Sequence, residues 1–62
     1  MTRRDYVLIA GALKTARAKL IPYPAQAVGC DTATHELAQV LGKANPRFDR
    51  MRFLAAAGVP VL

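Results

Sequence analysis

Apart from Asp5, which is expected in a helix cap, five side chains in this sequence are candidates for a nucleophile, an acid, a base or a metal ligand near neutral pH. They are Cys30, Asp31, His35, Glu36 and Asp49. Cys30 and His35 would form a thiolate and imidazolium pair only within hydrogen-bond reach of each other and with a third group to orient the ring. Because helical spacing around them directs His35 away from the apolar side, no such pair is expected.

The same side chains do not make up a metal site. Zinc takes three or four protein ligands, whereas Cys30 and His35 offer two. A chain of 62 residues also has little room for a substrate cleft beside a core. The sequence therefore predicts no enzymatic activity, no catalytic residue, no metal site, no cofactor and no small-molecule substrate.

Length and charge indicate the class of protein. Sixty-two residues form one small domain, 1–62, whose core is thin enough for a partner or a second copy to add stability. Nine Lys and Arg against four Asp and Glu give a net charge of +5, which favours nucleic acid or acidic protein surfaces. One cysteine forms no internal disulfide, and the apolar runs are too short to cross a bilayer. We expect a cytoplasmic protein without membrane contact.

A first helix is predicted over residues 3–19. Thr2 and Asp5 approximate a capping box at its start. Pro22 and Pro24 end it, because proline disfavours helical geometry in the preceding residue and donates no hydrogen bond. Apolar residues with helical spacing form the side that faces the core, namely Tyr6, Ile9, Ala10, Leu13, Ala16 and Leu20.

A second helix is predicted over residues 32–44. Asp31 or Thr32 is expected to cap it, and Gly29 to end a single helical turn before it. His35 lies opposite the centre of its apolar side and faces water. That side consists of Ala33, Leu37, Val40, Leu41 and Ala44.

A third helix is predicted over residues 49–57, where the local signals are densest. Asp49 is an N-cap, and Phe48 and Phe53 flank the first turn as a hydrophobic staple. Gly58 supplies the left-handed residue that closes the helix. Three residues are expected to point inward, namely Phe53, Leu54 and Ala57.

Three helices with short connections predict an all-α fold class, a small three-helix module. The alternation of apolar and polar residues that is typical of strands is absent. The apolar tail, 59–62, is expected either to fold back onto the core or to fray.

Both ends of the chain resemble a family of very small proteins encoded in phage and prophage genomes. Members begin near Met-Thr-Arg-Lys-Asp-Tyr and end near Asn-Pro-Arg-Phe-Asp-Arg-x-Arg-Phe-Leu-Ala-Ala-Cys-Gly. The matching blocks here are 1–6 and 45–58, about a third of the chain, with departures at Arg4 and at Ala57. The resemblance implies a phage or prophage origin and a place in the cytoplasm of the host cell, without implying an activity.

Leu8 projects from the polar side of the first helix, where water is expected. It is either a single exposed apolar residue or part of a contact with a partner or a second copy. Together with cations it would form an apolar patch with a basic rim, suited to an acidic, partly apolar target. The predicted function is that of a small phage-type accessory or regulatory protein that binds a host or phage protein. The predicted contact residues are Arg3, Arg4, Val7, Leu8 and Lys14.

The alternative is a regulator that binds DNA or RNA through the basic segment Asn45–Ala57. Ala38 and Gly42 have the spacing found near the turn of a helix-turn-helix, and Asn45 would cap a second helix with Pro46 at its first position. The hydrophobic staple favours the later helix start, so both starts stay open. The residues that would contact nucleic acid are Lys43, Arg47, Arg50 and Arg52.

Overall fold

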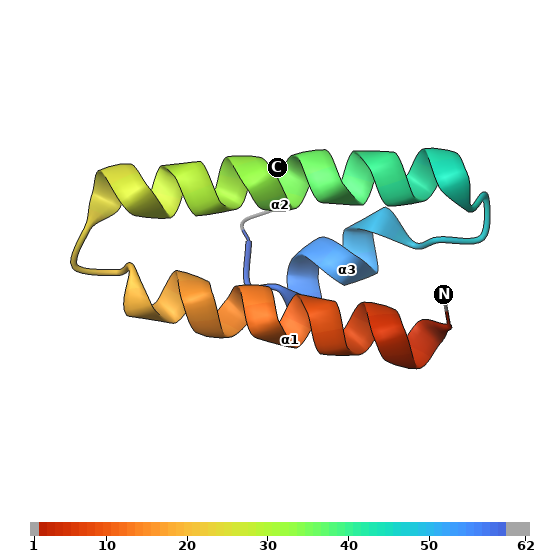
Figure 1. Cartoon of the computed structure of the whole chain (residues 1–62), viewed down its shortest axis with the longest axis horizontal. Helices are drawn as coiled ribbons and strands as arrows, with labels where there is room; N and C mark the ends of the chain where they lie inside the picture. Colours follow the sequence, from red (N-terminus) through yellow and green to blue (C-terminus); the bar gives the residue numbers. More distant parts are fainter. Residues whose placement is uncertain (1, 60–62) are drawn as a thin grey trace.

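The computed structural model describes residues 2–59, which contain three α-helices and no strand. These helices are α1 (Arg3–Lys19), α2 (Pro24–Ala44) and α3 (Arg50–Ala56). α1 and α2 run side by side as an antiparallel hairpin, and α3 packs against both near the start of α1 and the end of α2 (Figure 1). The predicted all-α three-helix class is confirmed.

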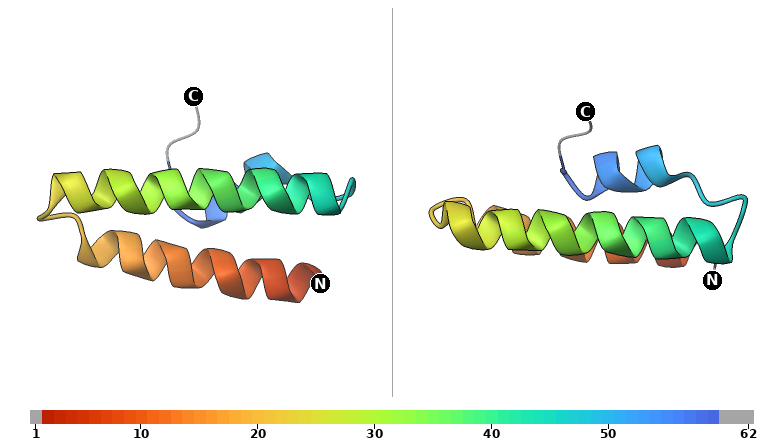
Figure 2. Two further views of the ribbon diagram at one scale, coloured as in Figure 1. Left: turned by 45° about the horizontal axis from the view of Figure 1, so that its top comes forward. Right: turned by 90° about the horizontal axis from the view of Figure 1, so that it is seen from above.

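The helices form two layers rather than a symmetric bundle. Figure 2 shows α1 and α2 in one layer and α3 on one side of it only. α3 has 7 residues, whereas α1 and α2 have 17 and 21, so it covers only part of the hairpin. The opposite side of the hairpin is uncovered by any element within residues 2–59.

α1 begins and ends where the sequence predicts. Thr2 Oγ1 accepts a hydrogen bond from the Asp5 backbone N–H at 3.3 Å, and the Asp5 carboxylate accepts one from the Thr2 backbone N–H at 2.9 Å. This confirms the capping box. The bonds from the Thr2 backbone and then from its hydroxyl hold the pKa of the Asp5 carboxyl below its usual value.

The prediction for the start of the second helix is wrong. α2 begins at Pro24, which has no N–H to leave unpaired at the first helical position, and it continues through Gly29. Asp31 caps no helix, because it lies in the interior of α2. Its Oδ1 instead accepts a hydrogen bond from Arg17 Nε of α1 at 2.8 Å. The Thr32 hydroxyl donates to the carbonyl oxygen four residues earlier, at 2.9 Å. Both polar side chains are therefore satisfied inside the helix.

The buried side of α2 also differs from the prediction. Thr34 and Ala38 are its buried residues, and the Thr34 hydroxyl donates to the carbonyl oxygen of Cys30 at 2.9 Å. A Cβ added at Gly42 would lie 3.9 Å from Cδ2 of Phe48. Small residues thus let α3 and its preceding turn approach this side of α2 closely.

The predicted apolar stripes are only partly buried as a consequence. On α1, Ala10 is buried but Ala16 is exposed. On α2, Leu37 and Leu41 are half-buried, whereas Ala33, Val40 and Ala44 are exposed. The exposed members point to the side that α3 leaves uncovered.

The start of α3 confirms the predicted cap and staple. Asp49 Oδ1 accepts a hydrogen bond from the Arg52 backbone N–H at 3.0 Å. The ring centroids of Phe48 and Phe53 lie 5.3 Å apart across the first turn. Cap and staple together fix the angle at which the chain enters α3.

The end of α3 is closed by Gly58, as predicted. Its φ is +77°, in the left-handed region. The Gly58 N–H donates to the Ala55 carbonyl at 3.0 Å, and the Val59 N–H donates to the Leu54 carbonyl at 3.1 Å. These two bonds form a Schellman motif, and the buried Val59 and Leu54 side chains complete it.

The core is small and lies where the three helices meet. It contains the three residues of α3 and its cap that were predicted to point inward. Its buried apolar members are Ala10, Ala38, Phe53, Leu54, Ala57 and Val59. The rest of the predicted tail, 60–62, lies outside the described residues. Among the helices of residues 2–59, none combines the length and the apolar character needed to cross a membrane.

Candidate functional site

A hollow of about 460 Å³ opens between α1, the connection from α2 to α3, and α3 itself. We call it the arginine hollow. It combines an apolar floor, a polar turn and basic side chains drawn from distant parts of the sequence. Its lining consists of Arg3, Tyr6, Val7, Ala10, Asn45, Arg47, Phe48, Asp49, Arg52, Phe53 and Ala56.

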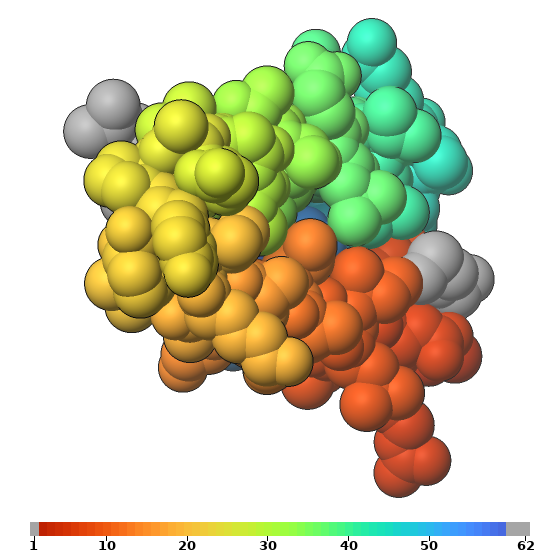
Figure 3. Space-filling view, turned by 60° about the vertical axis from the view of Figure 1, so that its left-hand side comes forward, coloured from red at the N-terminus to blue at the C-terminus, as the bar shows by residue number. Residues whose placement is uncertain are grey.

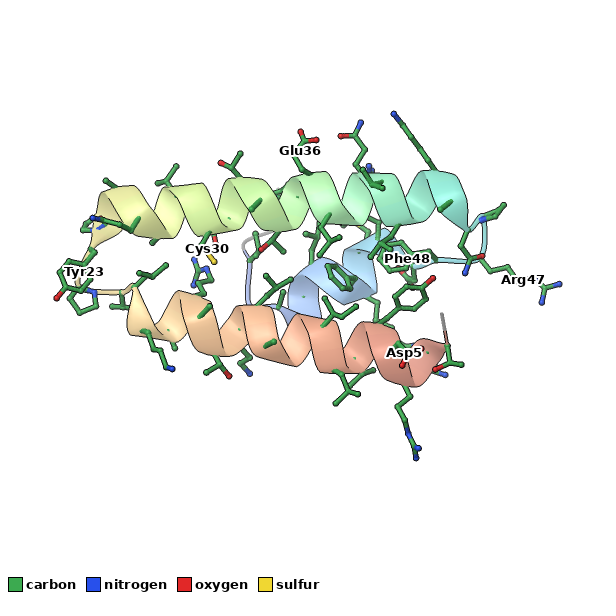
Figure 4. All side chains as sticks on the ribbon, viewed as in Figure 1. Asp5, Tyr23, Cys30, Glu36, Arg47 and Phe48 are labelled. Atoms are coloured by element: carbon green, nitrogen blue, oxygen red, sulfur yellow. The ribbon has the colours of Figure 1, made fainter. Side chains whose placement is uncertain are left out.

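Three aromatic rings make up much of the floor. The centroids of Tyr6 and Phe48 lie 4.7 Å apart with their planes at 64°, which is an edge-to-face contact. Phe53 continues the cluster on the other side of Phe48. Such contacts place the positive edge of one ring against the negative face of the next. In Figure 4, Phe48 turns inward beneath α2, whereas Arg47 points away from the helices.

Asn45 holds the connection between α2 and α3 against α1. Its Nδ2 donates to the Tyr6 hydroxyl at 3.2 Å, and its Oδ1 accepts from the Arg47 backbone N–H at 3.1 Å. The helix start with Asn45 as cap and Pro46 as first residue is therefore wrong. The turn that Asn45 forms instead positions Arg47 beside the hollow.

The charge of the arginine hollow is mainly positive. Three guanidinium side chains belong to its lining, those of Arg3, Arg47 and Arg52, against one carboxylate, that of Asp49. Asp49 already accepts a backbone hydrogen bond as the cap of α3. Within residues 2–59 the one ion pair joins Arg17 and Asp31. The arginines of the hollow thus have no ionic partner in the described part of the chain.

The residues predicted to bind a protein partner lie partly in the lining of the hollow and partly on the exposed side of α1 beside it. Arg3 and Val7 line the hollow, and Lys14 lies on the side of α1 facing the end of α3, where its Cγ is 3.5 Å from a Cβ built on Gly58. Arg4 and Leu8 are exposed outside the lining. Leu8 is 65% exposed, so its predicted exposure is confirmed.

The residues predicted to bind nucleic acid are also divided. Arg47 and Arg52 line the arginine hollow, whereas Lys43 and Arg50 line a second hollow of about 340 Å³ between α2 and α3. The segment from Ala38 to Gly42 lies inside α2, so it forms no turn between two helices. The predicted helix-turn-helix geometry is not present.

The side chains first considered for chemistry stay apart. Cys30 is half-buried and His35 is exposed. Five positions along one helix place them about 140° apart around its axis, so they do not form a pair. Figure 4 shows Cys30 directed towards α1 and Glu36 directed away from it. In the part of the chain that the structure describes, no three His, Cys, Asp or Glu side chains gather as a metal site.

Sequence reasoning missed the floor of the hollow, since it placed Tyr6 on the core side of the first helix and Phe48 in the hydrophobic staple. A signal was present in the two terminal blocks, 1–6 and 45–58. Nine of the eleven lining residues belong to them. The sequence shows the blocks separately, and only the fold places them side by side.

Comparisons with protein-family models, with curated proteins and with solved structures found no match to this chain. The site is therefore interpreted from its own geometry.

Proposed function

We propose that this chain is a small, non-catalytic accessory or regulatory protein of the phage type that its two ends resemble. It binds an acidic, partly apolar segment of a host or phage protein in the arginine hollow. What supports this is one observation: the fold brings an aromatic floor and three arginines together in a single hollow. Its expected place is the cytoplasm of the host cell, where an unpaired cysteine such as Cys30 is ordinary.

The size of the hollow favours a linear segment over a folded surface. Its volume of about 460 Å³ falls within the usual range of roughly 300–1,000 Å³ for binding pockets. That space holds a few side chains, such as those on one side of a short helix or an extended peptide. The partner therefore presents a short stretch of chain rather than a broad, flat surface.

The chemistry of the lining specifies the composition of that segment. A guanidinium group binds a carboxylate through two parallel hydrogen bonds. Arg3, Arg47 and Arg52 line the hollow, and the Arg47 side chain, which points away from the helices in Figure 4, turns towards the hollow when the segment binds. The rings of Tyr6 and Phe48 provide apolar surface between them. An aromatic or aliphatic side chain flanked by Asp or Glu fits both features.

The net charge of +5 assists binding from a distance. Complementary charge raises the rate of encounter, and this gain falls as salt screens it. Binding of an acidic segment is therefore expected to weaken with increasing ionic strength.

Nucleic acid is the alternative partner. The positive charge suits it, but the basic residues lie on two separate hollows and α3 has only 7 residues. A helix that reads a groove presents several side chains along one side, which is difficult within two turns. The geometry therefore favours the protein partner.

The test is a selection of random peptides displayed on a carrier and captured by the immobilised chain. We expect the enriched peptides to carry acidic residues next to an aromatic or large aliphatic residue. The affinity of one such synthetic peptide is then measured by fluorescence anisotropy. Arg3→Glu is expected to weaken it by at least about tenfold.

Arg4→Glu is the matched control. Arg4 is the same residue type one position along α1 and lies outside the hollow. An acidic residue in the first turn suits the helix dipole at both positions, so neither change is expected to harm folding. Peptides without acidic residues, or equal losses in both variants, would contradict the proposal.

Duplex DNA and RNA are titrated in parallel. Several phosphate contacts would give a steep decrease in affinity with salt. Tight nucleic-acid binding that Arg47→Glu and Arg52→Glu abolish, without any peptide binding, would establish the alternative.

A further inference from the structure

The side of the α1–α2 hairpin opposite α3 is a second surface with its own character. Figure 2 shows that nothing in residues 2–59 packs against it. We call this side the open face. It is defined by Ile9, Ala12 and Ala16 of α1 and Ala33, Leu37 and Val40 of α2.

Helical geometry assigns these residues to the open face. On α2, Ala38 and Gly42 line the hollow shared with α3, and Val40 lies about 160° around the helix from both. On α1, Ala10 contributes to the arginine hollow, and Ala12 lies about 160° away from it. Ala12 and Val40 thus point away from α3, whereas Ile9 and Leu37 lie at the inner edge of the open face and also pack against the core.

The open face is apolar and only partly covered by its own chain. Val40 is 58% exposed, Ala12, Ala16 and Ala33 are exposed, and Ile9 and Leu37 are half-buried. Figure 3 shows this side obliquely: α1 and α2 meet along a shallow furrow, at the bottom of which atoms of α3 are visible. The alanine side chains beside the furrow are short, so the helices of a second layer can approach the backbone closely.

The charge pattern identifies the partner that fits. None of the six residues that define the open face is charged, and the carboxylate of Asp5 continues their stripe on α1 at one end. The chain as a whole carries +5. A face without cations has no means of selecting an acidic partner, in contrast to the arginine hollow. Two copies that meet here bring apolar surfaces together and leave their arginine hollows on the outer sides, where the like charges are far apart.

The open face lies on the broad side of the molecule. The molecule measures 35 × 19 × 16 Å, and Figure 1 looks onto this broad side along the shortest of these dimensions. The six residues of the open face span about 10 Å at its centre. The outline of the whole broad side, 35 × 19 Å, is roughly 650 Å², so contact over all of it would bury at most roughly 1,300 Å², near the lower limit for specific interfaces. A two-fold axis would bring the same six residues of both copies together.

We propose that two copies of this chain associate through their open faces. Four long helices, α1 and α2 from each copy, form the centre of the dimer, and one α3 lies on each outer side. Each arginine hollow stays accessible, so the dimer presents two binding sites in opposite directions. This proposal rests on the open face and is independent of what occupies the hollow.

The test is sedimentation equilibrium of the whole chain over a wide range of concentrations. We expect a monomer–dimer equilibrium in the wild-type protein. Val40→Glu places two like charges near the interface and is expected to raise the dimer dissociation constant by at least about tenfold. Its control is Val28→Glu, since Val28 is a similarly exposed valine of α2, at 65%, about 120° around the helix.

A second pair of variants makes the test independent of any one substitution. Ala12→Glu lies on the open face of α1, and Ala18→Glu is an equally conservative change on its other side. Circular dichroism confirms that each variant keeps its helical content. We expect dissociation with Ala12→Glu and not with Ala18→Glu. Equal effects in both pairs, or a wild-type chain that stays monomeric at the highest concentration, overturn the proposal.

Salt separates this association from binding in the arginine hollow. Copies that each carry +5 repel one another, so screening by salt is expected to strengthen the dimer. The same screening weakens the binding of an acidic peptide. A dimer that salt dissociates would show that charged contacts, rather than the open face, hold the copies together.

Discussion

The two ends of the α1–α2 hairpin are built by different means. At the end next to α3, Tyr6, Phe48 and Phe53 pack ring against ring, and a cap and a Schellman motif close α3. At the end with the α1–α2 connection, apolar side chains remain in water: Ile21 is 68% exposed and Val28 is 65% exposed. The polar link there is the ion pair of Arg17 with Asp31.

This difference shows which part of the fold contributes most to its stability. A domain of about 60 residues buries only about 60% of the surface of its unfolded chain. Few side chains are fully buried, so these carry most of the packing energy. Here they lie beside the arginine hollow, and the same rings that hold α3 in place also line the hollow. The other end depends on helix regularity and a partly exposed ion pair. Matched substitutions at the two ends therefore test the comparison.

The largest expected effect is that of Phe53→Ala. The side chain is 4% exposed, and its removal leaves a cavity that costs about 3–5 kcal/mol. For a chain this small that loss is comparable with the whole free energy of unfolding. Urea denaturation followed by circular dichroism measures it. The counterpart at the other end, Ile21→Ala, is expected to change stability by no more than about 0.5 kcal/mol; equal losses would show that the ends do not differ.

Substitution of two glycines by alanine is expected to change the free energy of unfolding in opposite directions. Gly58→Ala forces a Cβ into the left-handed region and costs about 1–2 kcal/mol, although its nearest neighbour, at 3.5 Å, leaves room for the atom itself. Gly29→Ala lies inside α2 with nothing within 4 Å and is expected to add about 0.5–1 kcal/mol. Denaturation at a concentration where the chain is monomeric measures both. A gain at Gly58 would refute the role of its backbone conformation.

Two aspartates compare a cap with an ion pair. Asp49→Ala removes the cap of α3 and is expected to cost about 1 kcal/mol, which lowers Tm by about 4–8 °C. Asp31→Ala breaks a pair whose side chains are 23–30% exposed and is expected to cost less than about 1 kcal/mol. Thermal unfolding of both variants shows which substitution lowers Tm more. If Asp31→Ala lowered Tm further than Asp49→Ala, the connection end would be more strongly held than its packing indicates.

The smallest expected effect is a dependence on pH of the stability of the first turn of α1. The folded pKa of Asp5 is lowered from its ordinary value of 3.8, mainly by hydrogen bonds from the Thr2 backbone and hydroxyl. Its stabilising contribution is therefore present above that ordinary value and is lost as the pH falls through the folded value. The protection factor of the amides in the first turn of α1, which compares their exchange with that of an unstructured peptide at the same pH, is expected to fall in acid. Asp5→Asn should remove that change, and an unaltered acid dependence in the variant would assign it to another carboxyl.

Local signals in the sequence determined the features that arise within a few residues. The capping box at Thr2, the staple of Phe48 with Phe53 and the closure at Gly58 all involve partners within five positions. Their geometry depends on the backbone between them, so residue types at fixed spacing are sufficient to predict them. The bounds of α1 and the all-α class follow from the same local rules.

Tertiary contacts decided the rest, because they join residues that no local spacing relates. Asp31 is of a residue type that often caps helices, and it was predicted to do so. Instead its carboxylate binds Arg17 of α1, and α2 continues through Asp31. Asn45 contacts Tyr6 across 39 positions and so brings the two terminal blocks into one hollow. Which side of α2 is buried depends on where α3 docks, and that docking also leaves the open face uncovered.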